Sequence, residues 1–191
     1  AFLSSLGADQ PSGTGPIVGL HRQEKRLREI GVDVLLLRPT YFMENVGGNL
    51  PMIKHQGING GAIGADVKMP FIASQDIADF ATTALLARDW KGVEVRELLG
   101  PREYTMAEIT SILGAKIGKA DLKYVTFPYP DFAKALTGFG FSQSVADGYA
   151  EMSKAFNEGR VKSLEGRSAR NTTATTFESF ADGLAKAYAS A

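Results

Sequence analysis

Apolar and polar positions along this chain follow the patterns of an α/β protein. Residues 34–38 begin with four consecutive apolar positions and lie between Gly31 and Pro39; such a run predicts a central parallel strand that is buried on both faces. The preceding segment 17–30 places apolar residues on one face at helical spacing, so it predicts a helix that ends at Gly31. Further strands are predicted at 2–5, 68–73, 93–99 and 122–127.

The order of predicted strands and helices changes near residue 100, so we divide the chain into residues 1–100 and 101–191. Thr105 and Glu108 have the spacing of a capping box, which marks the start of a helix. Helices are predicted from the Pro39 turn to Lys54 and at 74–87, 105–118, 131–136, 142–158 and 175–188. Strands alternate with helices up to residue 99, which favours a parallel sheet. Residues 101–191 are mostly helical, and we expect them to form a small substrate or cap region near the carboxyl edge of that sheet.

Composition excludes several classes of function. The 191 residues include 44% hydrophobic residues, enough for a core, and 21 basic residues balance 21 acidic ones. This balance argues against nucleic-acid binding by phosphate neutralisation. No apolar stretch approaches the roughly 20 residues that span a bilayer, so we expect no membrane association. The absence of cysteine excludes disulfides and a cysteine nucleophile and is compatible with a cytoplasmic location. Two histidines are too few to indicate a metal site.

The carboxyl end of the strand 34–38 is the first candidate site. Ligands of open α/β sheets lie in the crevice beyond the carboxyl ends of the strands. Backbone amides ahead of a helix can bind an oxygen-rich ligand there, although a βα turn packed by aromatic side chains would have the same sequence. The candidate residues of this turn are Pro39, Thr40, Tyr41, Phe42 and Asn45.

Two serines mark the end of another predicted strand on the same edge. The hydroxyl of Ser4 or Ser5 could bind a ligand carbonyl or amide, or could equally satisfy the local turn. The glycine-rich segment 57–64 is predicted to be a flexible turn near the mouth of the site, because no strand is predicted before it and no helix after it.

No glycine-rich dinucleotide fingerprint follows a predicted strand anywhere in the chain. A complete dinucleotide-binding domain needs several βαβ units before residue 34, each of about 30 residues or more. We therefore expect this chain to be the C-terminal part of a longer protein, and we expect residues 1–191 alone to bind NADPH weakly or not at all.

A set of short motifs spread over most of the chain supports a family resemblance. The most specific is Leu37-Arg38-Pro39 followed by Tyr41-Phe42-Met43-Glu44-Asn45. The weaker ones are Leu3-Ser4-Ser5, Glu24 seven residues before Gly31, Asp76-Ile77-Ala78 and Tyr104-Thr105 with Glu108-Ile109. With these motifs the chain resembles the NmrA-like family of atypical short-chain dehydrogenases/reductases. The resemblance implies a Rossmann-like fold of which this chain lacks the N-terminal βαβ units.

The resemblance also implies a cofactor, NADP or NAD, and a function. NmrA-like proteins are either NAD(P)H-dependent reductases of quinone-like or other small apolar acceptors, or non-catalytic sensors of the dinucleotide. Carried over motif by motif, Ser4, Ser5 and the turn from Pro39 to Asn45 are expected near the nicotinamide end of the cofactor. A small-molecule substrate is implied, and a homodimer or a regulatory protein partner is left open.

Two further residues, His21 and Phe127, are candidates for substrate binding. His21 and Lys25 imitate the Tyr-x-x-x-Lys spacing of short-chain dehydrogenases, in which i and i+4 share a helix face. NmrA-like proteins that keep the lysine place it at the position of Leu20, so standard carbonyl-reductase chemistry is in doubt. His21 is nevertheless a candidate because imidazole titrates in the useful range. Phe127 belongs to an aromatic-rich zone, most of it core, that is expected to contribute to an apolar pocket.

Overall fold

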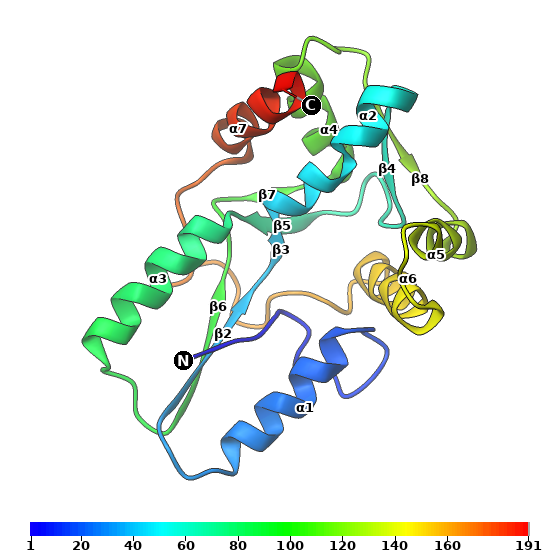
Figure 1. Ribbon diagram of the computed structural model, residues 1–191. Helices are drawn as coiled ribbons and strands as arrows, with labels where there is room; N and C mark the ends of the chain where they lie inside the picture. Colours follow the sequence, from blue (N-terminus) through cyan, green and yellow to red (C-terminus); the bar gives the residue numbers. More distant parts are fainter. Residues whose placement is uncertain (191) are drawn as a thin grey trace.

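The structure is a computed structural model that describes residues 1–190. A three-stranded parallel sheet forms the lower part of the molecule in Figure 1. Strand β2 (Val34–Pro39) lies between β1 (Phe2–Leu3) and β6 (Val93–Leu98). All six residues of β2 are buried, and helices α1 (Ile17–Arg28) and α3 (Ser74–Ala87) lie on opposite sides of the sheet (Figure 1). The predicted α/β class with a parallel sheet is therefore confirmed.

Side chains of β2 alternate between the two covered faces. Leu35 and Leu37 belong to the same apolar cluster as Ile77 of α3, whereas Arg38 binds Glu24 of α1. This alternation is what a strand with a period of two residues requires. The strand is thus held by apolar packing on one face and, at its carboxyl end, by an ion pair on the other.

Beyond the carboxyl end of β2 the chain enters two smaller sheets. Strand β3 (Tyr41–Phe42) pairs in parallel with β5 (Met69–Ile72), which pairs antiparallel with β7 (Glu103–Tyr104). Strands β4 (Ile58–Gly61) and β8 (Lys123–Thr126) form a separate parallel pair. The main hydrophobic core lies among these strands and the helices that cover them.

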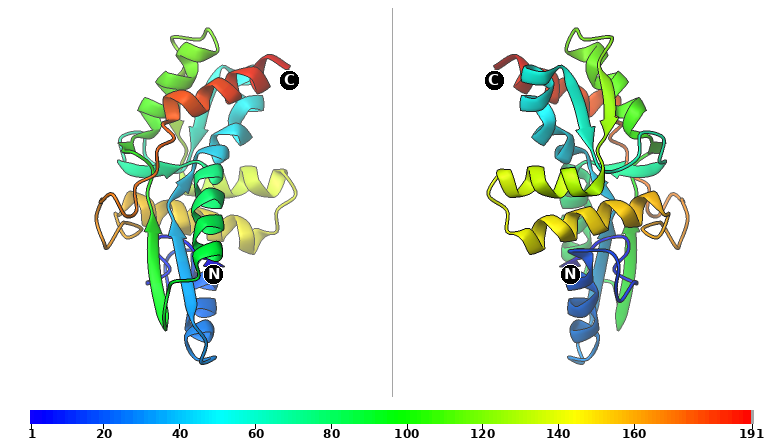
Figure 2. Two further views of the ribbon diagram at one scale, coloured as in Figure 1. Left: turned by 90° about the vertical axis from the view of Figure 1, so that its left-hand side faces the viewer. Right: turned by 90° about the vertical axis from the view of Figure 1, so that its right-hand side faces the viewer.

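The remaining helices complete the molecule. They are the 3₁₀ helix η1 (Met43–Asn49) and the α-helices α2 (Leu50–Gln56), α4 (Met106–Lys116), α5 (Tyr129–Gly138), α6 (Gln143–Asn157) and α7 (Phe177–Ser190). Helices α5 and α6 form a hairpin that projects from one side of the molecule (Figure 2). The capping box predicted at Thr105 and Glu108 is present, with both hydrogen bonds formed. No helix within residues 1–190 is long and apolar enough to span a membrane.

One local prediction is wrong and another is correct only in part. The segment predicted as a flexible glycine-rich turn contains β4, whose partner β8 is too distant in sequence for a local pattern to reveal the pairing. A Cβ at Gly60 would lie 2.5 Å from the Phe127 ring, so glycine permits the ring to pack on this strand. The helix predicted from the Pro39 turn to Lys54 is α-helical only in α2, because β3 and the 3₁₀ helix η1 precede it. Gly47 and Gly48 lie in η1, and glycine weakens a regular α-helix.

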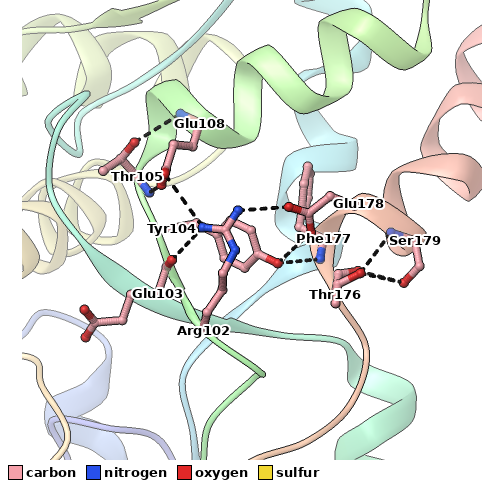
Figure 3. Close-up of polar contacts among 9 residues, drawn as sticks. All are labelled: Arg102, Glu103, Tyr104, Thr105, Glu108, Thr176, Phe177, Glu178 and Ser179. Atoms are coloured by element: carbon pink, nitrogen blue, oxygen red, sulfur yellow. Dashed lines mark hydrogen bonds and ion pairs between the residues drawn. The ribbon is translucent and has the colours of Figure 1, made fainter.

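Tyr104 connects the N-terminal end of α7 to the rest of the molecule (Figure 3). Its hydroxyl donates a hydrogen bond to Glu178 at 2.9 Å and accepts one from the Phe177 backbone N–H, also at 2.9 Å. The Arg102 guanidinium lies 3.7 Å from the centroid of the Tyr104 ring and donates to the other oxygen of Glu178. Burial raises the pKa of Tyr104, so the hydroxyl stays protonated and keeps its donor role at neutral pH.

We expect Tyr104→Phe to lower the free energy of unfolding by about 1–3 kcal/mol, because the Phe177 N–H loses its buried acceptor. Urea denaturation at pH 7 measures the change. The matched control is Tyr149→Phe, since the Tyr149 ring is exposed and we expect a change below about 0.5 kcal/mol. Equal stability of wild type and Tyr104→Phe would contradict the role given to this hydroxyl.

Candidate functional site

A cavity of about 290 Å³ lies at the carboxyl end of β2, between the body of the molecule and the α5–α6 hairpin. Five aromatic side chains from β3, β8 and the hairpin contribute to its wall; they are Tyr41, Tyr124, Phe132, Phe141 and Tyr149. Small-molecule sites are commonly concave and apolar, with few polar groups. This cavity has that character, and its position agrees with the crevice rule for α/β sheets.

Most polar side chains of the cavity are already bonded within the protein. The Asn49 amide donates to Asn59 at 2.7 Å and to the Gly60 carbonyl at 3.0 Å. Asn59 in turn donates to the Thr110 hydroxyl at 2.8 Å. The Tyr124 hydroxyl donates to the Ile63 carbonyl at 2.9 Å. These bonds fix the cavity wall.

Tyr41 has a different environment. Its ring makes edge contacts with Phe71 and Phe156, with centroid distances of 5.1 and 6.1 Å. Its hydroxyl has no hydrogen-bond partner within residues 1–190, and burial raises the pKa of Tyr41 to about 12. The ring is therefore held in place, and the hydroxyl remains a neutral donor across the physiological pH range.

The structure divides the seven residues predicted to contact the cofactor into two groups. Ser4, Pro39 and Thr40 are buried, and the hydroxyls of Ser4 and Thr40 donate to Glu24 and to the Pro70 carbonyl. Their positions serve the fold of the turn. Accessible surface remains on Ser5, Tyr41, Phe42 and Asn45. Of these four, Tyr41 and Asn45 line the cavity, and the Ser5 hydroxyl donates to the Leu6 carbonyl at 2.9 Å.

A buried ion pair between Arg38 and Glu24 holds the residues that precede the Pro39 turn. Arg38 donates to both carboxylate oxygens of Glu24, at 2.9 and 2.6 Å, and Ser4 donates to the same carboxylate at 2.5 Å. Burial by itself would raise the pKa of Glu24, but the hydrogen bonds from Arg38 and Ser4 outweigh it and lower that pKa. The bidentate geometry fixes the plane of the Arg38 guanidinium relative to the Glu24 carboxylate. The cluster therefore holds the carboxyl end of β2, where the turn begins.

His21 and Phe127, the predicted substrate residues, do not line the aromatic cavity. His21 lies in a separate polar cavity with Asp9 and Lys25, and a ring nitrogen of His21 is 2.9 Å from the Ala8 carbonyl oxygen. The backbone of Phe127 donates to the Gly61 carbonyl at 2.8 Å while its ring packs on Gly60. Leu20, at the position of the family's lysine, packs against the main core.

Several cavity residues were not among the sequence candidates. Tyr149 and Met152 come from α6, and no local pattern connects them with the Pro39 turn. Phe132 of α5 belongs to the aromatic-rich zone from which the sequence predicts an apolar pocket, and it lines this cavity. Asn49 and Asn59 had no such signal, because isolated asparagines are common in turns and at helix ends.

The parallel sheet, the helices on both of its sides and the cavity at its carboxyl edge define a Rossmann-like α/β protein. A model of the NmrA-like family matches residues 20–181. The chain belongs to the NmrA-like family.

Individual relatives are similar to this chain over most of its length. An NAD(P)H azoreductase of Xenophilus azovorans is 28% identical over 201 aligned positions that cover 100% of this chain and 67% of the relative. Festuclavine dehydrogenase of Aspergillus fumigatus is 32% identical over 71% of this chain and 46% of its own length. The structure of an NADPH-dependent quinone oxidoreductase from Escherichia coli superposes with a TM-score of 0.80 at 26% identity, covering 95% of this chain and 66% of the oxidoreductase. The chain thus spans about half to two thirds of the length of these proteins.

Proposed function

We propose that this chain carries the acceptor site of an NAD(P)H-dependent oxidoreductase that reduces small, flat, apolar acceptors of the quinone type. The observation that carries the proposal is the aromatic cavity at the carboxyl end of β2, about 290 Å³ in volume, which fits a molecule of one or two fused rings. Similarity to the azoreductase and to the quinone oxidoreductase supports the same class of reaction.

The accessible part of the Pro39 turn suits the nicotinamide end of a dinucleotide. Asn45 is exposed, and its amide has no hydrogen-bond partner within residues 1–190, so it can serve a carboxamide or a ribose hydroxyl. Ser5 lies two residues beyond the end of β1, on the same edge of the sheet, and its hydroxyl can accept a hydrogen bond. The solved complex of the quinone oxidoreductase with NADPH favours the phosphorylated cofactor.

Bound there, the reduced nicotinamide supplies a hydride, and the protein orients it and excludes water. The residues of this chain do the positioning. The Glu24–Arg38 pair fixes the end of β2, and the aromatic wall removes the acceptor ring from water. Quinone reduction does not strictly require the Tyr-Lys pair of carbonyl reductases, so the leucine at position 20 is compatible with this reaction.

The test is titration with NADPH and NADH of a protein in which the βαβ units of a complete dinucleotide-binding domain precede this chain, followed by oxidation with a panel of quinones and azo compounds. We expect that protein to bind NADPH and to show acceptor-dependent oxidation. Binding without turnover on any acceptor would favour the second candidate, a non-catalytic sensor of the dinucleotide. The specific observation behind the sensor is Leu20, a partly buried apolar side chain that packs against the core and cannot serve in acid–base chemistry.

A further inference from the structure

Most polar side chains that line the cavity already form hydrogen bonds within the protein, so few of their donors are available to a ligand. Asn49, Asn59 and Tyr124 use their donors within the protein, and the Ser153 hydroxyl donates to the Tyr149 carbonyl at 3.0 Å. Once these groups are accounted for, the lining side chains whose N–H or O–H donors make no hydrogen bond within residues 1–190 are Tyr41, Asn45 and Tyr149. An acceptor that enters the cavity therefore meets an apolar wall and three donors.

These three donors differ in their exposure and rigidity. Asn45 in η1 and Tyr149 in α6 are both exposed, so water competes for the Asn45 amide and the Tyr149 hydroxyl. The Tyr41 ring is half-buried between Phe71 and Phe156, and its backbone belongs to β3, which pairs with β5. A donor held in apolar surroundings makes a stronger hydrogen bond than an exposed donor. The Tyr41 hydroxyl is therefore the donor in this cavity best suited to hold a ligand oxygen in a fixed position.

We propose that the Tyr41 hydroxyl binds a carbonyl oxygen of the quinone-type acceptor and donates the proton that completes its reduction. This rests on the proposed function and assigns a residue to it. A bound reduced nicotinamide would supply the hydride and the two electrons and would be oxidised in the process. The hydride forms the O–H bond at the distal quinone oxygen, the ring becomes aromatic, and the π pair of the other C=O bond moves onto the oxygen beside Tyr41. This oxygen takes the Tyr41 proton as the tyrosine O–H bond breaks, and the Tyr41 oxygen then regains a proton from water.

Two probes of the same shape test the assignment without any cofactor. 1,4-Naphthoquinone carries carbonyl oxygens and naphthalene has none, so the ratio of their dissociation constants isolates the contribution of a hydrogen bond. Ligand-observed NMR titration of the wild type, Tyr41→Phe and Tyr124→Phe gives this ratio. Tyr124→Phe is the matched control because the Tyr124 hydroxyl already donates to Ile63.

We expect Tyr41→Phe to reduce the preference for naphthoquinone over naphthalene by about threefold to tenfold, the value of one neutral hydrogen bond. Tyr124→Phe should leave the ratio unchanged even if it weakens both probes. An unchanged ratio in Tyr41→Phe would overturn the proposal, and so would failure of the wild type to bind naphthoquinone. Both outcomes are independent of NADPH binding, which tests the proposed function separately.

Discussion

Arg38→Met is expected to lower the free energy of unfolding by about 3–5 kcal/mol, because it leaves the Glu24 carboxylate buried without its partner. The side chains of Arg38 and Glu24 are only 8% and 3% exposed, and their closest N···O distance is 2.6 Å. Methionine keeps most of the arginine's apolar length, so the loss reports the missing charge and hydrogen bonds rather than a large cavity. Urea denaturation at pH 7 measures it.

Two controls separate the ion pair from its surroundings. Arg28 contacts the same carboxylate at 3.5 Å but is 41% exposed, and we expect Arg28→Met to change stability by less than about 1 kcal/mol. The double variant Glu24→Leu/Arg38→Met removes both charges and should recover most of the loss, because a well-packed apolar pair can replace a buried ion pair. A double variant as unstable as Arg38→Met would show that the charge is not the cause.

The same pair predicts a pH dependence. Since the folded protein lowers the pKa of Glu24 below its ordinary value of 4.5, this group contributes stability that is fully present well above pH 4.5. The contribution is lost as pH falls from that region through the folded pKa. We expect the difference in unfolding free energy between wild type and Arg38→Met to be largest near pH 7 and to shrink below pH 4.5. Denaturation series from pH 3 to 7 test this, and a constant difference would contradict it.

Features carried by neighbouring residues could be predicted from the sequence. The apolar run of β2, the helix α3 at 74–87 and the capping box at Thr105 were all correct because each depends on a few consecutive side chains. Strand β4 was missed because its stability comes from pairing with β8. Its glycines carry no side chains that could form an alternating apolar pattern, and a glycine-rich segment usually predicts a turn.

The candidate site was predictable to the same extent. Position at the carboxyl end of a strand identified Tyr41 and Asn45, which line the cavity. The sequence could not show that the Ser4 and Thr40 hydroxyls are directed to protein acceptors, because both acceptors come from other elements of the chain. The wall supplied by α5 and α6 depends on how the hairpin packs, which is a property of the tertiary structure.

Gly15 packs directly against α6 of the hairpin. Its φ of +57° lies in the left-handed region that favours glycine, and its N–H donates to Glu151 of α6 at 3.1 Å. A Cβ at this position would overlap the carbonyl oxygen of Gly148, also in α6. Because Tyr149 and Met152 of the same helix line the cavity, we expect a side chain at Gly15 to displace part of the cavity wall.

We therefore expect Gly15→Ala to lower the free energy of unfolding by about 2–4 kcal/mol, as the sum of left-handed backbone strain and overpacking. The matched control is Gly19→Ala in α1, where a Cβ meets no atom within 4 Å; alanine in a helix should stabilise the protein there by about 0.5–1 kcal/mol. Urea denaturation measures both, and naphthoquinone titration of the folded variants should show weaker binding only in Gly15→Ala. Equal stability of the two variants would mean that α6 moves aside without cost, and the hairpin would then be a mobile cover of the cavity rather than a fixed wall.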